Sequence, residues 1–499
     1  MDRFVFLTSF LICLFSSLLV CELDGQDFAN DIVDRARTPT QSGTQEPAVG
    51  PQANTAQQDP EQRARVLKAV INEMNELIPG EYPADSPQQQ QLMELASAFV
   101  QLDAAAVDAA TKKLAELDPN LPPQGLLLAG ANFTISNASG GRAILERAAI
   151  EYPEHPSISL AFSRLALSQG RLSDALALVE KSVRQMKASE FSPVAQRHYQ
   201  LETIDAQQII AQRQNRLEDA LALVQQWEQL AANSPKMLLA RAEIEFLKGN
   251  IETSQNYLRK FRAVVPDSRP TELVLANWYR QKGDVAGTEQ WIKAAAANFP
   301  DNPVVQMELG SWSMSQGDFE TAQKAIGAAE AKQGEKPTTD LMKARLAFAQ
   351  GDYPQAESRF AELYLQQPSS FDISNMYVLS LAENEDDSKK QLAVQLAQRN
   401  LQSLPNNQIA QAALGWSLFK TGNSKDAKTL FSRVTRMQRL PPEIAYYVAT
   451  ILEQEGKREQ AKQLLQSALQ SKGLFLYRGQ AKQMLERFGA PPTAENPER

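Results

Sequence analysis

The stretch PVVQMELGSWSMSQGDFETAQKAIGAAEAKQ, from Pro303 to Gln333, contains the pattern that decides the fold. Gly317 separates two segments of about a dozen residues, and each segment is long enough for one helix of three turns or more. Glycine readily adopts the left-handed conformation that ends a helix, so Gly317 predicts a turn between two helices. Gly310 and Ala322 are small and stand where the two helices would cross. The stretch therefore predicts one tightly packed helical hairpin.

The same pattern recurs along the chain with a period of 34 residues, apart from one slip of three residues. Its turn positions are Asn215, Gly249, Gly283, Gly317, Gly351, Ser388, Gly422 and Gly456. Small residues follow five positions later, at Ala220, Ser254, Thr288, Ala322, Ala356, Ala393, Ala427 and Ala461. One hairpin cannot bury its apolar face alone, so the repeated hairpins are expected to stack into a solenoid.

These units resemble tetratricopeptide (TPR) repeats. The pair Leu309-Gly310, the turn at Gly317 and the small Ala322 and Ala329 stand at the positions that the family pattern requires. The resemblance extends from about Gln88 or Leu126 to Phe488. It implies an all-α fold, a right-handed α-solenoid of about ten or eleven stacked helix-turn-helix hairpins. A terminal helix over residues 476–488 is expected to cover the last hydrophobic face.

Two interruptions of the period bear on domain organisation. Gly170 and Asn215 are 45 residues apart, eleven more than one period, which predicts longer helices on either side of Phe191-Ser192-Pro193. We interpret this site as the boundary between an irregular N-terminal array, residues 63–190, and a C-terminal solenoid with its capping helix, residues 191–488. The second interruption, AENEDDSKK at 382–390, predicts a solvated loop, with a calcium or partner contact as the alternative.

The two ends of the chain differ from the repeats in composition. Phe4 to Val20 carries no charge, which is typical of the apolar region of a secretion signal. Cys21 follows in a position that resembles a bacterial lipobox, so residues 1–21 are compatible with a cleaved signal peptide, a lipoprotein signal or an uncleaved membrane anchor. Each alternative predicts an extracytoplasmic location, whether periplasmic, secreted or membrane-anchored. Residues 22–62 and 489–499 are polar and proline-rich and are predicted to be a disordered linker and tail.

The net charge and the small numbers of cysteine and histidine residues argue against several kinds of function. The chain has 51 basic and 59 acidic residues, a net charge of −8, which argues against nucleic acid as the main partner. Cys13 and Cys21 both lie in the first 21 residues, and His155 and His198 stand far apart. His155 is expected in a surface turn and His198 on a long helix. We therefore predict no catalytic residues, no metal site and no cofactor.

The resemblance also implies a binding surface. Ligands of the TPR family usually lie along the concave face, which the first helix of each unit lines. Carried over by register, these positions are Leu239, Phe246, Leu273, Asn277, Arg280, Met307, Ser311, Met314, Leu341, Arg345, Phe348, Trp416, Phe419 and Tyr446. Such a stripe of aromatic, methionine and arginine side chains suits an extended peptide or an amphipathic helix. The alternative is that many of these side chains pack between neighbouring helices.

The function predicted from the sequence is a non-catalytic, extracytoplasmic scaffold that binds a partner protein or peptide in this groove. One alternative is a structural component of a cell-envelope assembly or export machine, acting through its convex face or through self-association. Another alternative is an enzyme subunit whose catalysis resides in a partner. Asn277 and Arg280 supply only part of the family's carboxylate clamp, so an acidic C-terminal peptide is not the predicted ligand.

Overall fold

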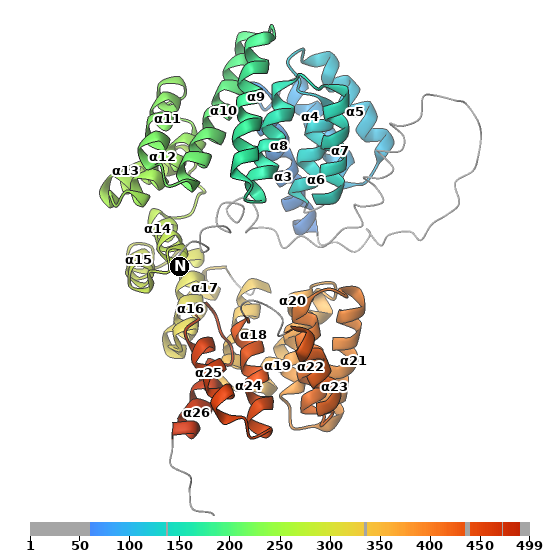
Figure 1. The fold of residues 1–499 in the computed structure, drawn as a ribbon, viewed down its shortest axis with the longest axis vertical. Helices are drawn as coiled ribbons and strands as arrows, with labels where there is room; N and C mark the ends of the chain where they lie inside the picture. The colour runs from blue at the N-terminus through green and yellow to red at the C-terminus, as the bar shows by residue number, and fades with distance from the viewer. Residues whose placement is uncertain (1–59, 136–137, 334–336, 435–439, 472, 490–499) are drawn as a thin grey trace, which may run out of the picture. The chain divides into compact units, whose positions relative to one another are not determined.

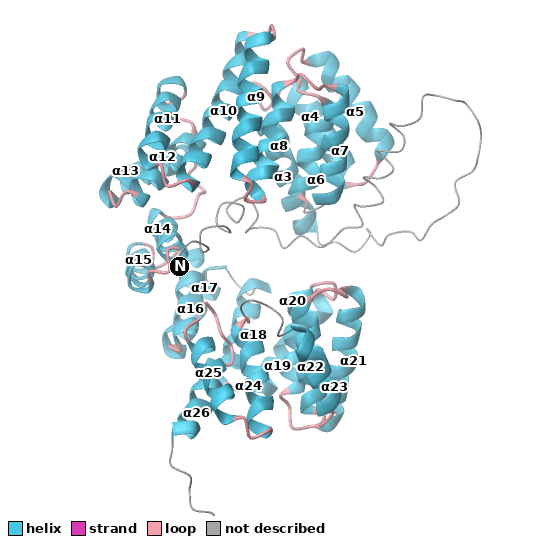
Figure 2. Cartoon of the chain, in the orientation of Figure 1, coloured by secondary structure: helices cyan, strands magenta, loops and turns pink. Residues whose placement is uncertain are grey.

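A computed structural model describes residues 60–135, 138–333, 337–434, 440–471 and 473–489 (Figure 1). Within these ranges all regular secondary structure is helical, as Figure 2 shows. No helix in the described part of the chain is both long and apolar enough to cross a membrane. The predictions for the signal or anchor at 1–21, for most of the linker at 22–62 and for nearly all of the tail at 489–499 lie outside the described residues.

The chain divides into two compact units, Met1–Ser268 and Arg269–Arg499. The first unit contains α3 (Pro60–Leu77), α4 (Pro87–Val100), α5 (Ala104–Leu117), α6 (Gln124–Thr134), α7 (Ala138–Glu151), α8 (Pro156–Ser168), α9 (Leu172–Ala188), α10 (Pro193–Arg213), α11 (Leu217–Leu230), α12 (Pro235–Leu247) and α13 (Ile251–Val264). The second unit contains α14 (Thr271–Gln281), α15 (Val285–Asn298), α16 (Pro303–Gln316), α17 (Phe319–Gln333), α18 (Pro337–Gln350), α19 (Tyr353–Gln366), α20 (Phe371–Ala382), α21 (Asp387–Ser403), α22 (Gln408–Lys420), α23 (Ser424–Val434), α24 (Pro442–Gln454), α25 (Arg458–Leu469) and α26 (Arg478–Gly489).

Consecutive helices pack in pairs, and most pairs stack on the next one within their unit (Figure 1). The first two pairs, α4/α5 and α6/α7, are joined through α3, which contacts both α4 and α6. In the described residues the pairs from α4/α5 to α24/α25 make eleven hairpins, which confirms the predicted all-α solenoid. The first helix of a pair has neighbours on more sides than the second. Most residues of α20 are therefore buried, whereas α19 buries only Ala356, Phe360 and Leu363.

The hairpin of α16 and α17 shows why this sequence forms the repeat. Asn302 caps α16, because its side-chain oxygen accepts from the backbone N–H groups of Val304 at 2.9 Å and Val305 at 3.3 Å. Gly317 ends the helix with φ +83°, a conformation that suits glycine. A Cβ atom on Gly310 would lie 3.0 Å from Ile326, so the crossing requires a very small residue.

The two interruptions of the period have different structures. The longer helices predicted around residues 191–193 are α9 and α10, and Ser192 caps α10 by accepting from the Ala195 N–H at 3.2 Å. The division suggested there falls inside the first unit, where α9 and α10 pack together. Ser388, expected at a turn, is instead helical, because Asp386 caps α21 and starts that helix about one turn early.

One helix at each end of the described chain lies outside the hairpins. α3 packs against α4 and α6, so helical structure begins three residues before the predicted end of the linker. α26 is the terminal helix expected at 476–488, and it packs against both α25 and α18. The contact with α18 joins positions more than a hundred residues apart, which the period alone does not predict.

Candidate protein-binding surfaces

Aromatic side chains gather in the second unit where the first helices meet the C-terminal segment, defined here as Leu474–Gly489. The Trp416 ring of α22 stacks on Tyr447 of α24, with ring centres 4.5 Å apart. Tyr477 of the segment stacks on Tyr446 at 4.8 Å and meets Phe348 of α18 edge-on at 5.2 Å. Residues from α18, α22, α24 and the segment therefore form one aromatic cluster.

A buried carboxylate lies beside this cluster. The Glu383 side chain is 7% exposed, and its Oε1 accepts from Trp416 Nε1 at 2.8 Å and from Tyr477 OH at 3.0 Å. Its Oε2 accepts from Lys420 Nζ at 2.8 Å. Glu383 belongs to the stretch 382–390 that was predicted to be a solvated loop, and for this side chain the prediction is wrong. Glu383 directly follows the last residue of α20, so its side chain turns inward while Glu385 and Asp386 stay exposed.

The C-terminal segment is held by residues from distant helices. Gln480 Nε2 donates to Tyr353 OH at 2.8 Å, across 127 positions of sequence. Phe475 and Tyr477 are almost completely buried. Burial and the neighbouring Glu383 raise the pKa of Tyr477 far above its ordinary value, so its hydroxyl keeps the proton that it donates. The segment thus covers part of the surface that the first helices present.

Beside the segment, a cavity of about 260 Å³ leaves part of the same surface open. Met376, Leu379 and Ala412 give it an apolar wall, and the ion pair between Arg345 and Asp372 adds charge. Further lining residues come from α22, α24 and the segment, namely Ile409, Ala413, Ile444, Tyr447, Leu476 and Tyr477. The volume is slightly below the range of about 300–1,000 Å³ of small-molecule pockets, and it suits one or two peptide side chains.

A second and more polar cavity, of about 580 Å³, separates α24 from α26. Its lining includes Tyr446, Glu453, Gln483 and Arg487. Burial, followed by the nearby Glu383, raises the pKa of Tyr446 to about 12. This hydroxyl therefore stays neutral at physiological pH and serves as a hydrogen-bonding group rather than an acid.

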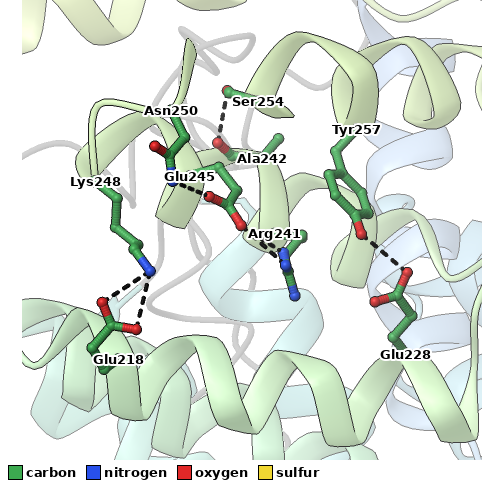
Figure 3. Close-up of polar contacts among 9 residues, drawn as sticks. All are labelled: Glu218, Glu228, Arg241, Ala242, Glu245, Lys248, Asn250, Ser254 and Tyr257. Atoms are coloured by element: carbon green, nitrogen blue, oxygen red, sulfur yellow. Dashed lines mark hydrogen bonds and ion pairs between the residues drawn. The ribbon is translucent and has the colours of Figure 1, made fainter. Parts of the chain in front are cut away.

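In the first unit, a polar network joins α12 to α13 (Figure 3). Arg241 pairs with the buried Glu245 at 3.0 Å, and Asn250 Nδ2 donates to the other oxygen of Glu245 at 2.8 Å. Ser254 Oγ donates to the Ala242 carbonyl at 2.7 Å. Because the Glu245 carboxylate is bonded on both oxygens, the network stabilises the hairpin and does not require a ligand.

The same hairpin is attached to α11 by two further contacts seen in Figure 3. Lys248 pairs with Glu218 at 2.9 Å, and Tyr257 OH donates to Glu228 at 3.2 Å. The Tyr257 ring also lies near the cationic groups of Arg241, at 5.3 Å, and Lys260, at 4.6 Å. These contacts fix the stacking of one repeat on the next.

Charged side chains of α3 and of the first helices of the hairpins interact in the first unit. Glu76 of α3 pairs with Lys236 of α12, and Arg164 of α8 pairs with Glu202 of α10. Burial raises the pKa of the Glu73 carboxyl, an effect that the Arg164 and Lys236 charges oppose. A Cβ atom on Gly130 of α6 would lie 2.6 Å from Leu77, so the glycine lets α3 pack closely.

The residues predicted for the groove divide by unit and by burial. Phe246, in the first unit, and Leu273, Met314, Phe348, Trp416 and Phe419, in the second, are buried. The half-buried positions are Leu239 in the first unit, and Asn277, Arg280, Met307, Ser311, Leu341, Arg345 and Tyr446 in the second. The structure brings Phe348, Trp416 and Tyr446 together around Tyr477, and Arg345 at the neighbouring cavity. Arg280 pairs with Glu308, and ligand binding by these residues stays a prediction.

Both histidines lie in the first unit and are partly buried. His155, expected at the surface, caps α8, and its ring lies 5.6 Å from Phe191 and 5.5 Å from Tyr199. Burial lowers the pKa of His155 and of His198 to about 4, so both are neutral at pH 7. Among the described residues there is no group of three His, Cys, Asp or Glu that could hold a metal ion.

Comparison with known proteins gives one family match and several solved structures. No curated protein sequence matches the chain. Yeast Tom70 is 12% identical and covers 82% of this chain and 96% of its own, with a TM-score of 0.33. The Cut9–Hcn1 hetero-tetramer of the APC/C is 11% identical over 83% of this chain and 98% of its own, also at 0.33. A thermophilic TPR protein of Thermus thermophilus is 15% identical over 37% of this chain and 100% of its own, at 0.31.

The family match falls in the second unit, on the hairpins that carry the aromatic cluster. Residues 341–407 and 412–473 match the model of the tetratricopeptide repeat family. These ranges begin in α18 and end just before the C-terminal segment. The match shows tetratricopeptide repeats in this part of the second unit, and the hairpins of both units have the same helix-turn-helix form.

Proposed function

We propose that the chain is a non-catalytic, extracytoplasmic scaffold that binds an apolar segment of a partner protein on the first helices of its second unit. The tetratricopeptide fold supports a protein–protein interaction scaffold in general. The observation that carries the finer proposal is the cavity of about 260 Å³ between α18, α20, α22, α24 and the C-terminal segment. Its wall is mainly apolar, and such surfaces are used to anchor peptide side chains.

Ile409 supports a docking role for the rim of this cavity. It lines the cavity and is 51% exposed, although it is a large apolar residue. Arg345 and Asp372 lie at the same cavity as an ion pair, so the site offers both signs of charge beside the apolar wall. A partner segment with an apolar side chain and polar neighbours would match this surface.

Substitution of Ile409 by glutamate tests the proposal without disturbing the core. Phe348 and Trp416 are unsuitable for this purpose, because both are buried and a glutamate there would destabilise the fold. The full-length chain and its Ile409→Glu variant would be used as bait in envelope extract, with crosslinking and mass spectrometry. A partner recovered by the wild type and reduced at least tenfold with the variant is the expected result.

Val304 provides a matched control in another repeat. Val304 and Ile409 both stand two residues after a capping asparagine, at equivalent positions of α16 and α22, and Val304 is 45% exposed. Val304→Glu should recover the partner as well as the wild type does. Equal loss with both variants, or equal recovery with both, would reject the cavity as the binding site.

The extracytoplasmic part of the proposal is supported by the uncharged stretch from Phe4 to Val20. Fractionation of cells that express the full-length chain tests this part separately. Recovery of the protein in the periplasmic, secreted or membrane fraction is expected. Recovery in the cytoplasm would reject the extracytoplasmic location. It would not bear on the proposed binding site, which the capture experiment with Ile409→Glu tests.

A further inference from the structure

The C-terminal segment contacts the first helices through groups typical of a bound peptide. Residues 473–477 are not helical, and α26 begins only at Arg478. Phe475 and Leu476 are buried apolar side chains, while Tyr477 and Gln480 donate hydrogen bonds to Glu383 and Tyr353. Apolar anchors combined with a few directional hydrogen bonds are the usual basis of peptide recognition in a groove.

The acceptors of these hydrogen bonds lie on different repeats. Tyr353 begins α19, Glu383 follows α20, and the Trp416 and Lys420 groups that orient Glu383 belong to α22. The receptor surface therefore consists of three consecutive hairpins, and the segment returns to it from the end of the chain. A terminal helix that only capped the last hairpin would need contacts with α24 and α25 alone.

We propose that this surface is a peptide-binding site whose resident ligand is the chain's own segment, and that a partner peptide of the same chemistry exchanges with it. The ligand carries two bulky apolar residues, then a tyrosine, and an amide side chain three positions later, as Phe475-Leu476-Tyr477 and Gln480 do. The tyrosine hydroxyl donates to Glu383, and the amide donates to Tyr353. This inference rests on the proposed function, because it places the partner on the same face of the second unit.

The linkage to the chain explains why the segment would be the resident ligand. Because it is joined to α25 by a few residues, its effective concentration at the site is high, about millimolar. A free peptide at micromolar concentration competes poorly against it. Weakening the segment's own hydrogen bonds should therefore open the site to a peptide added in solution.

The experiment uses the full-length chain and a fluorescein-labelled synthetic peptide with the sequence of residues 473–489. The double variant Tyr477→Phe, Gln480→Ala keeps the aromatic ring and removes both donors. Fluorescence anisotropy should show the peptide binding this variant at least ten times more tightly than it binds the wild type. A peptide that carries the same two substitutions should bind the double variant at least ten times more weakly than the unmodified peptide does.

The control is the double variant Lys482→Ala, Glu486→Ala, which alters exposed positions on the same helix. It should bind the peptide no better than the wild type. If the donor-deficient variant stays helical by circular dichroism but does not gain affinity for the peptide, the proposal is wrong. It is equally wrong if that variant unfolds the second unit, because the segment would then be a permanent part of the core. Neither of these results depends on the capture experiment with Ile409→Glu. Failure of the exchange proposal can therefore be distinguished from failure of the proposed function.

Discussion

At the residue scale, Glu383 is a buried carboxylate beside the aromatic cluster that accepts three hydrogen bonds. Its carboxylate accepts from Trp416, Lys420 and Tyr477. Glu383→Ala leaves these donors without an acceptor and should lower the free energy of unfolding by about 3 kcal/mol. Urea unfolding followed by tryptophan fluorescence measures this change. The exposed neighbour Glu385→Ala should stay within about 0.5 kcal/mol of the wild type, and a similar loss in both variants would contradict the role of Glu383.

A second residue predicts how stability depends on pH. Burial raises the pKa of Glu243 in α12 from 4.5 to about 7, with Arg213 opposing the shift. The folded chain therefore holds this proton more tightly than the unfolded chain does. The resulting stabilisation is complete below pH 4.5 and is lost as the pH rises through 7.

Glu243→Gln removes the charge that burial disfavours. At pH 8 the variant should be more stable than the wild type by up to about 3 kcal/mol, and at pH 4 the two should be nearly equal. Urea unfolding at both pH values measures the difference. Glu252→Gln, at an exposed position of α13, corrects for the loss of one negative charge. A gain at pH 8 that is equal for both variants would show that burial of Glu243 is not the cause.

At the element scale, two glycines of one hairpin should respond in opposite directions to the same substitution. Gly317 has φ +83°, and a Cβ atom added there would meet no atom within 4 Å, so alanine costs only backbone strain, about 1 kcal/mol. Gly327 lies inside α17, also with free space, so alanine should stabilise the helix by about 1 kcal/mol. Thermal unfolding of both variants tests this, and the same sign for both would contradict it.

The hairpins were predictable because turn residues and small crossing residues have local requirements. Gly317 and its equivalents satisfy a backbone conformation, and Asn215 satisfies the same one with φ +58°. Ser388 failed as a turn position because the capping Asp386 starts α21 earlier than the period indicates. Glu383 could not be recognised, since its three partners lie 33 to 94 residues away in sequence. The period placed Phe348 and Trp416 on the first helices of their hairpins. It could not predict that the C-terminal segment packs against these two residues, because that contact lies outside the repeat.

At the scale of the whole molecule, each unit combines stacked hairpins with one helix from an end of the described chain. α3 packs on α4 and α6 in the first unit, and α26 packs on α25 and α18 in the second. In a solenoid the terminal repeats have an uncovered apolar face, and α26 reduces the exposed area of the last one. α3 instead contacts both of the first two hairpins and joins them. α26 also reaches α18, which ties the end of the second unit to an earlier repeat and should make its unfolding more cooperative than that of an open array.

Hydrogen exchange can test how far a perturbation spreads in each unit. Phe360 of α19 is fully buried in the core of the second unit, and Phe360→Ala should cost about 3–5 kcal/mol because it leaves a cavity. Because α26 connects back to α18, loss of protection should extend from α18 to α26 rather than stop at the nearest hairpins. Leu114→Ala in α5, a buried position of the first unit, serves as the matched core variant and should leave the protection of α18–α26 unchanged. If Phe360→Ala affects only α18 to α21, stability in the second unit is a sum of nearest-neighbour terms, and the contact between α26 and α18 adds no cooperativity.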